Sequence, residues 1–155
     1  MAKKSFKEKL EDSKDLPKVV KLEGKLVKMW GKGTCVIPAP KEVGEIMRSV
    51  PSGKLITINQ IRERLAKKHN ATIGCPITTG IFARIAAGAA EEDKAEGKEE
   101  ITPYWRTLKA GGVINEKYPG GAEEQKKLLE KEGHKVIQKG KKYVVEEFEE
   151  NLMKD

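Results

Sequence analysis

A proline followed by two aromatic residues and an arginine, Pro103-Tyr104-Trp105-Arg106, is the stretch of this chain best suited to hold a ligand. Proline fixes its own φ and pushes the preceding residue into an extended conformation, so the aromatic side chains enter on a defined path. Glycine pairs at 111–112 and 120–121 allow sharp turns after them. The segment therefore predicts a loop that presents side chains to a ligand. The alternative is that the two rings plug the core beneath a loop.

The other candidates for chemistry are cysteines. The chain has two, Cys35 and Cys75, far apart and without metal-ligand spacing, so we predict reduced thiols, no disulfide, and no metal or cofactor. Cys75 precedes a proline near the start of a predicted helix, where the helix dipole can lower the pKa of a thiol. Only His69 is close to it in sequence. A buried or idle cysteine is therefore the favoured interpretation, and Cys35 is expected in the core.

The charge balance favours a nucleic-acid partner without establishing one. The 155 residues include 31 Lys and Arg against 24 Asp and Glu, which gives a net charge of +7. No apolar run approaches the roughly 20 residues of a membrane helix, and the N-terminus lacks the apolar core of a signal peptide. We expect a cytoplasmic, monomeric protein without membrane association, with one domain and a small appendage.

Three helices are predicted in the middle of the chain. The first follows a proline pair and carries apolar residues at helical spacing over 43–50. The second opens at Thr57, an N-cap with Gln60 three residues later, as in a capping box. Thr78 or Thr79 caps the third. With short strands beside them, these helices predict a mainly α fold with small β elements. Their order is typical of a winged helix-turn-helix domain, although successive helices also build bundles that bind no nucleic acid.

The ends of the chain follow different patterns. Residues 1–20 predict a solvated charged arm with at most one weak amphipathic turn, from Phe6 to Leu10. Residues 91–100 predict a charged linker that is mobile at its tip. Residues 121–132 predict a short amphipathic helix, and 135–145 a β-hairpin followed by a frayed acidic helix. The predicted divisions are 1–39 for a basic arm with an extended segment, 40–133 for the winged helix-turn-helix domain, and 134–155 for the hairpin extension and acidic helix.

Several short motifs stand in an order and at spacings that are specific when taken together. They are Val50-Pro51-Ser52-Gly53-Lys54-Leu55-Ile56-Thr57, Gln60-Ile61, the third helix at 79–87, Pro103-Tyr104-Trp105-Arg106, Tyr118-Pro119-Gly120-Gly121, and Lys127-Leu128-Leu129-Glu130-Lys131-Glu132-Gly133. Over about 40–133 the chain thereby resembles the DNA-binding domain of the alkylguanine-DNA alkyltransferases and the alkyltransferase-like proteins. The first 40 residues and the terminal hairpin lie outside this resemblance.

The resemblance implies DNA binding without alkyl transfer. Tyr104 stands where the family has its acceptor cysteine and Trp105 where it has the activating histidine. A phenol with a reference pKa of about 10 is a poor nucleophile at neutral pH, and no imidazole stands beside it. In lacking the acceptor cysteine, the chain resembles the alkyltransferase-like proteins, which bind alkylated guanine in DNA without repairing it and recruit repair factors. We therefore expect a non-catalytic protein whose partners are duplex DNA, alkylated DNA included, and a repair protein.

The same resemblance suggests a DNA-binding surface and a base pocket. The surface comprises Thr57, Gln60, Thr78, Thr79 and Arg84, and the pocket comprises Tyr104, Trp105, Arg106 and Glu132. The family's helix arginine, which fills the gap left by a flipped nucleotide, is Thr79 here, and its phosphate-rotating tyrosine is Ile58. Arg84 is a candidate substitute or else a solvated helix residue. Two alternatives stay open: a protein-interaction or RNA-binding module on this scaffold, and an active methyltransferase that uses a different cysteine.

Overall fold

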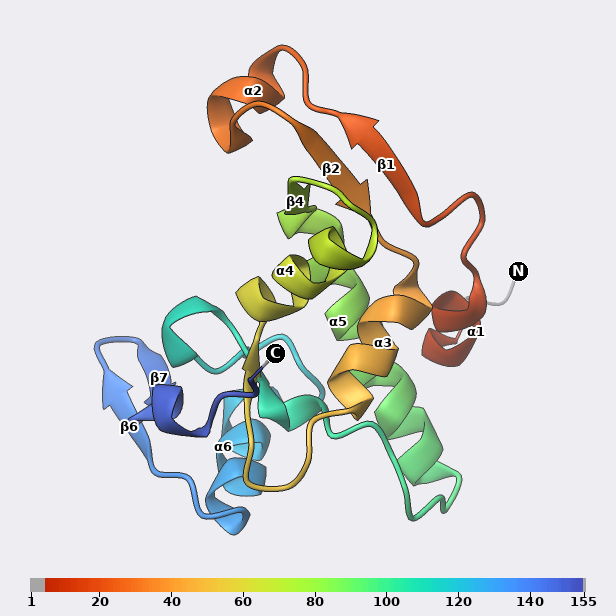
Figure 1. Ribbon diagram of the computed structural model, residues 1–155. Coiled ribbons are helices and arrows are strands. Elements are labelled where there is room, and N and C mark those ends of the chain that lie inside the picture. Colours follow the sequence, from red (N-terminus) through yellow and green to blue (C-terminus); the bar gives the residue numbers. More distant parts are fainter. Residues whose placement is uncertain (1–4, 155) are drawn as a thin grey trace.

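The computed structural model describes residues 5–154 (Figure 1). Its helices are α1 (Phe6–Glu11), α2 (Lys25–Trp30), α3 (Pro40–Arg48), α4 (Ile58–Lys68), α5 (Pro76–Ala95) and α6 (Gly121–Lys131), with the 3-10 turns η1 (Tyr104–Arg106), η2 (Ala110–Gly112) and η3 (Phe148–Asn151). Its strands are β1 (Lys18–Lys21), β2 (Thr34–Ile37), β3 (Ile56–Thr57), β4 (Ile73–Gly74), β5 (Thr107–Leu108), β6 (Val136–Lys139) and β7 (Lys142–Val145). The prediction of a mainly α fold with small β elements is confirmed. None of the helices in this part of the chain is long and apolar enough to cross a membrane.

The main hydrophobic cluster lies where α3, α4 and α5 meet (Figure 1). From α3, Val43 and Met47 are fully buried, and from α4 so are Ile61 and Leu65. The face of α5 that meets them is made mostly of alanines between positions 83 and 90. Because alanine side chains are short, the backbone of α5 can approach α3 closely. The three helices therefore share one hydrophobic core.

The start of α4 follows the predicted capping box. The Thr57 hydroxyl accepts a hydrogen bond from the Gln60 amide at 3.2 Å, and the Gln60 side chain accepts one from the Thr57 amide at 3.0 Å. Strand β3, which includes this cap, pairs in parallel with β5. That pairing places η1, which directly precedes β5, beside the entry to α4.

The start of α5 differs from the prediction. Cys75 is the N-cap, and its sulfur accepts a hydrogen bond from the Thr78 amide at 3.5 Å. The prediction that Thr78 or Thr79 caps this helix was wrong. Cys75 is followed by a proline at the first helical position, where the missing N–H costs nothing. The helix begins at that proline and so includes both threonines.

The far end of α5 is held by α1. The helix α5 runs to Ala95, so the prediction of a mobile charged linker was wrong for residues 91–95. Residues 6–11 are helical where a weak amphipathic turn was predicted, and they pack against α5 instead of lying in solvent. The Glu92 carboxylate accepts hydrogen bonds from the Phe6 and Lys7 amides at 3.0 and 2.8 Å. Gly88 permits this contact, because a Cβ there would lie 2.4 Å from the Phe6 ring.

The N-terminal lobe is a small sheet with order β1-β2-β4 and the helix α2 at its tip (Figure 1). Strands β1 and β2 are antiparallel, and β2 is parallel to β4, which leads into α5. Helix α2 was not predicted from the sequence. Leu22, Cys35 and Cys75 form the buried cluster of this lobe. The lobe is thereby attached to the start of α5.

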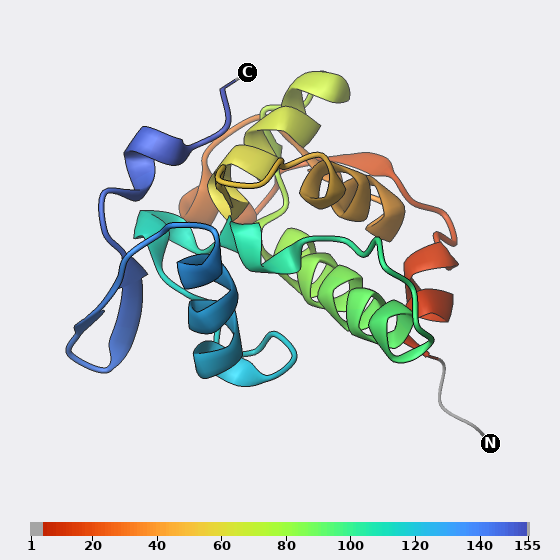
Figure 2. The ribbon, with the colours of Figure 1, turned by 90° about the horizontal axis from the view of Figure 1, so that it is seen from below.

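The C-terminal segment packs against the rest of the chain. The predicted hairpin is confirmed as β6 and β7, and Val113 forms an antiparallel bridge to Val144. The acidic segment after it forms η3 instead of the predicted helix. The chain then returns to β3, where the Met153 amide donates to the Leu55 carbonyl at 2.7 Å. Figure 2 shows this segment beside α6, which contributes Leu129 to the second hydrophobic cluster.

Candidate nucleic-acid interface

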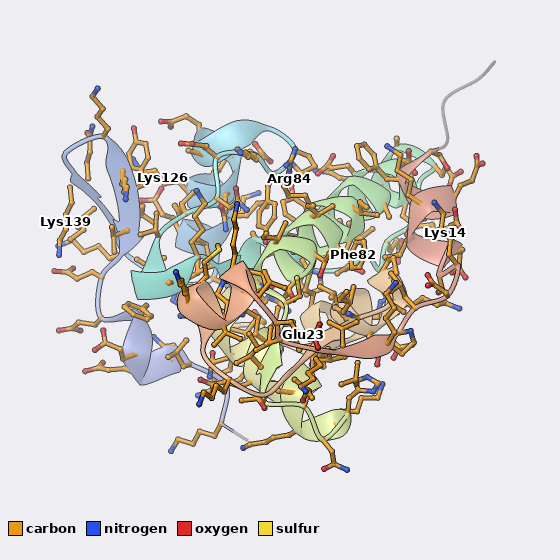
Figure 3. All side chains as sticks on the ribbon, turned by 90° about the horizontal axis from the view of Figure 1, so that it is seen from above. Lys14, Glu23, Phe82, Arg84, Lys126 and Lys139 are labelled. Atoms are coloured by element: carbon orange, nitrogen blue, oxygen red, sulfur yellow. The ribbon has the colours of Figure 1, made fainter. Side chains whose placement is uncertain are left out.

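The N-terminal half of α5 has one face exposed to solvent. Ile77 and Ile81 are 59% and 45% exposed, although both are large and apolar. The opposite face is buried and carries Thr79 and Ala83. Arg84, one turn beyond Ile81, is also exposed, and Figure 3 shows its position on α5. Isoleucine side chains without a partner on the surface are a mark of a contact surface.

A cavity of about 390 Å³ lies along this exposed face. We call it the α5 groove. It is lined by α4 residues Asn59 and Arg62, by α5 residues Ile77, Ile81 and Arg84, and by loop residues Lys109 and Lys117, among others. These residues come from three segments that are far apart in sequence. Helix α4 packs against α5, and η2 packs against β3 and β7, so residues of all three segments line one cavity.

The electrostatics of the α5 groove favour an anion. Four of its lining side chains are cationic, and none of those that the structure describes there is a carboxylate. Arg62 is held in place, since its Nε donates to the Gly74 carbonyl at 2.9 Å. Arg84, Lys109 and Lys117 form no ion pair with any residue from 5 to 154. Their charges are therefore free to meet phosphate groups.

Of the five residues predicted for the DNA-binding surface, the groove contains Arg84. Thr57 and Gln60 are occupied by the capping box, and the Gln60 amide group also donates to the Met153 carbonyl at 2.8 Å. Thr79 is fully buried, and the Thr78 hydroxyl is enclosed within the protein. These four side chains do not line the groove in this structure. The sequence analysis missed Ile77, and it had no signal that would bring Lys109 and Lys117 to α5.

Tyr104, the first residue predicted for the base pocket, lies in the core. Its side chain is 0% exposed, and its hydroxyl donates to the Glu91 carboxylate at 2.9 Å. Its ring meets those of Trp105 and Tyr118 edge-on, with centroids 5.4 and 5.6 Å away. Burial raises the pKa of the phenol well above its usual range, and the neighbouring Glu91 carboxylate adds to this. Tyr104 therefore lines no open pocket here and is a poor nucleophile.

Arg106 and Glu132 form an ion pair that joins η1 to the end of α6. The Arg106 Nε donates to both carboxylate oxygens of Glu132, at 2.9 and 3.0 Å. A second guanidinium nitrogen donates to the Val50 carbonyl at 2.6 Å. Burial alone would raise the pKa of Glu132, but the hydrogen bonds and charge of Arg106, together with the neighbouring Trp105 side chain and Gly53 amide, outweigh it and hold the pKa below its usual range. Both predicted pocket residues thus have structural partners.

Trp105 lies at the edge of a different cavity. This cavity, of about 500 Å³, is lined by Trp105 and Arg106, by the end of α3, and by Glu99 and Glu100. The Trp105 ring is half-buried and packs against both hydrophobic clusters, with the Arg106 guanidinium 5.4 Å from its centroid. The assignment of Trp105 to a base pocket stays a prediction.

Comparison with known proteins gives a match in structure. No protein-family model and no curated protein matches the chain by sequence. Among solved structures, S. pombe Atl1 in complex with damaged DNA containing O6-carboxymethylguanine superimposes with a TM-score of 0.51 at 20% identity, covering 75% of this chain and 94% of that one. This chain shares the fold of Atl1. A structure of S. pombe ATL in complex with DNA gives a TM-score of 0.48 at 19% identity, over the same 75% and 94%.

Within this Atl1-like fold, neither cysteine is placed to act as an acceptor. Cys35 and Cys75 are 2% and 7% exposed. Burial, together with the adjacent Cys75, raises the pKa of the Cys35 thiol to about 11. A neutral, enclosed thiol is a weak nucleophile. Groups of three or more side chains able to hold a metal ion are absent from residues 5–154.

We expect that the purified protein takes up no alkyl group from alkylguanine DNA. The reason is that the Tyr104 phenol and both thiols are buried, and that burial raises the pKa of the phenol and of the Cys35 thiol. Intact-mass spectrometry after incubation with an alkylated duplex checks this, with the unmodified duplex as control. A stoichiometric mass increase, mapped to any residue, would contradict the prediction.

Proposed function

We propose that this protein is a non-catalytic, duplex-DNA-binding protein that contacts DNA through the α5 groove. The observation that carries the proposal is the lining of the groove. It includes four cationic side chains and two exposed isoleucines, and none of the described lining residues is a carboxylate. The fold of Atl1, a protein whose structure was solved with damaged DNA, supports the same assignment.

The groove has two kinds of contact to offer DNA. Arg84, Lys109 and Lys117 would neutralise phosphates, which supplies affinity without sequence preference. Ile77 and Ile81 project from the same face, and apolar side chains of this size are used by minor-groove proteins as wedges between base steps. We therefore propose that α5 enters the minor groove, with its isoleucines in place of the helix arginine that the sequence lacks. The loop from Lys109 to Lys117 would act as a wing.

Recognition of damaged bases is a separate part of the proposal. Tyr104 is enclosed by other rings, so the aromatic surface open to a base belongs to Trp105. Stacking of a base on an aromatic side chain is worth about 1–3 kcal/mol. A preference for alkylguanine would therefore act through Trp105, and recruitment of a repair protein would follow from it.

The proposal predicts a salt-dependent affinity that falls when groove charges are removed. In the variant Arg84→Gln/Lys117→Gln, the slope of log K against log salt should shrink by about 0.9 for each phosphate that the variant no longer neutralises. Both side chains are exposed and unpaired within the described part of the chain, so the fold should not change. Fluorescence anisotropy with a labelled duplex at several salt concentrations measures the slope.

A matched control removes two cations elsewhere. Lys25 and Lys28 are exposed on α2, in the N-terminal lobe, and Lys25→Gln/Lys28→Gln should leave the slope unchanged. Parallel titrations with an alkylguanine duplex, a single strand and RNA test the finer claims. Equal weakening by both variants, or no binding to duplex DNA at low salt, would refute the α5 groove as the interface. Binding to RNA alone would indicate the RNA-binding alternative.

A further inference from the structure

The β6–β7 hairpin is fixed to the scaffold beside the α5 groove. Besides the Val113–Val144 bridge, the Ile114 amide donates to the Tyr143 carbonyl at 2.9 Å. The Tyr143 hydroxyl donates to Glu123 on α6 at 3.0 Å. Val136 and Val145, paired across the two strands, are buried in the second hydrophobic cluster. The hairpin therefore holds a defined position relative to η2 and α6.

The tip of this hairpin concentrates positive charge. It reads Lys139-Gly140-Lys141-Lys142, and all four residues are exposed. Lys139 lies directly opposite Lys142 in the strand register. Like charges in this position repel each other and destabilise a hairpin. The three lysines form no ion pair with any residue of the described chain, so the fold itself gains nothing from them.

The hairpin tip also continues the cationic surface of the α5 groove. A cavity of about 330 Å³ lies between the hairpin and η2, with Lys141 and Lys142 on one side. Lys109 and Ala110 line both this cavity and the α5 groove, so the two are contiguous. Glu116 is the carboxylate at this cavity. Three lysines, Lys109, Lys141 and Lys142, outweigh it.

The acidic residues that follow the hairpin include those of η3. Figures 2 and 3 both show η3 away from the tip of the hairpin. In Figure 3, Arg84, Lys126 and Lys139 lie along one side of the molecule, from α5 to the hairpin. Lys126 is held over the Tyr143 ring at 5.4 Å, which keeps its charge on this side.

We propose that the β6–β7 hairpin is a second DNA-contacting element, whose tip lysines bind duplex phosphates beyond the segment covered by the α5 groove. The inference rests on the proposed function, because it extends the same bound duplex. Lysine ammonium groups are compact point charges without the fork geometry that reads bases. The hairpin therefore adds length and affinity to the contact and adds no sequence preference.

The test removes the tip charges and compares the result with a distal triple variant. In Lys139→Gln/Lys141→Gln/Lys142→Gln, the slope of log K against log salt should fall by about 0.9 per phosphate released, or roughly 2.7 for three. The control Lys25→Gln/Lys28→Gln/Lys32→Gln carries the same charge change in the N-terminal lobe, which Figure 1 places far from the hairpin. A graded series of duplex lengths provides a second readout. Lengthening the duplex should raise the affinity of the wild type and of the control more than that of the tip variant.

The outcomes separate this inference from the proposed function. Suppose that the wild type binds duplex DNA, Arg84→Gln/Lys117→Gln weakens binding, and the tip variant behaves as the distal control does. The hairpin inference then fails and the α5 groove stands. If the wild type binds no duplex at low salt, the proposed function fails first. Thermal unfolding should show the tip variant at least as stable as the wild type, because the repulsion between Lys139 and Lys142 is removed. A triple Lys→Arg variant should keep the wild-type slope, because charge alone is required.

Discussion

Replacing Tyr104 with alanine is expected to lower the free energy of unfolding by about 3–5 kcal/mol. The ring is 0% exposed and is enclosed by Trp105, Tyr118 and the main hydrophobic cluster, so its removal leaves a large cavity. Urea unfolding followed by circular dichroism measures the loss. A residue that lined an open base pocket would instead leave stability nearly unchanged.

The variant Tyr104→Phe is the control for this substitution. It keeps the ring and removes only the hydrogen bond to Glu91. The expected loss is about 1 kcal/mol, typical of one hydrogen bond. A Tyr104→Ala protein as stable as Tyr104→Phe would mean that the ring is not a core element. In that case the base-pocket assignment of Tyr104 would regain support.

Removal of the Glu132 carboxylate is expected to have an effect of similar size. Glu132 and Arg106 have side chains only 12% and 14% exposed, and Glu132→Ala leaves the guanidinium buried without its anion. Breaking one partner of a buried pair costs about 3–5 kcal/mol. The double variant Arg106→Met/Glu132→Leu removes both charges. Its loss of unfolding free energy should therefore be smaller than the sum of the losses of Arg106→Met and Glu132→Leu. Strict additivity in urea unfolding would argue against coupling between these two residues.

The pH dependence of stability provides an independent check on this pair. The pKa of Glu132 is lower in the folded protein than its usual value of about 4.3. The stabilisation is therefore complete above that value and is lost as the pH falls through the folded pKa. The difference in unfolding free energy between wild type and Glu132→Gln should shrink below about pH 4. A difference that stays constant down to pH 2–3, roughly two units lower, would contradict the charge-based explanation.

Local signals in the sequence predicted local structure. The Thr57–Gln60 capping box was found because all of its atoms lie within one turn of chain. The hairpin at 135–145 was found for the same reason, from a glycine turn between two apolar runs. The overall likeness to the alkyltransferase-like fold was found from motif order, and the Atl1 comparison supports it at the level of the fold.

The sequence did not predict which face of α5 packs inward. Hydrophobic periodicity alone assigns the larger side chains to the core, and on α5 it does not single out Ala83. The structure buries Ala83 and exposes Ile81, because close packing against α3 needs the smaller residue. Two of the five residues predicted to bind DNA, Thr78 and Thr79, are enclosed for this reason. The prediction of a mobile linker also failed because of a distant contact. Glu92 accepts hydrogen bonds from amides about 85 residues away in sequence.

The central claim is that duplex DNA lies along the α5 groove. Backbone amide chemical shifts, recorded during titration with a short duplex, test it most directly. We predict that the largest changes fall in the α5 segment from Ile77 to Arg84 and in the loop from Lys109 to Lys117, with the hairpin tip following as the duplex is lengthened. Changes concentrated in the lobe of β1, α2 and β2, with α5 unaffected, would contradict the account.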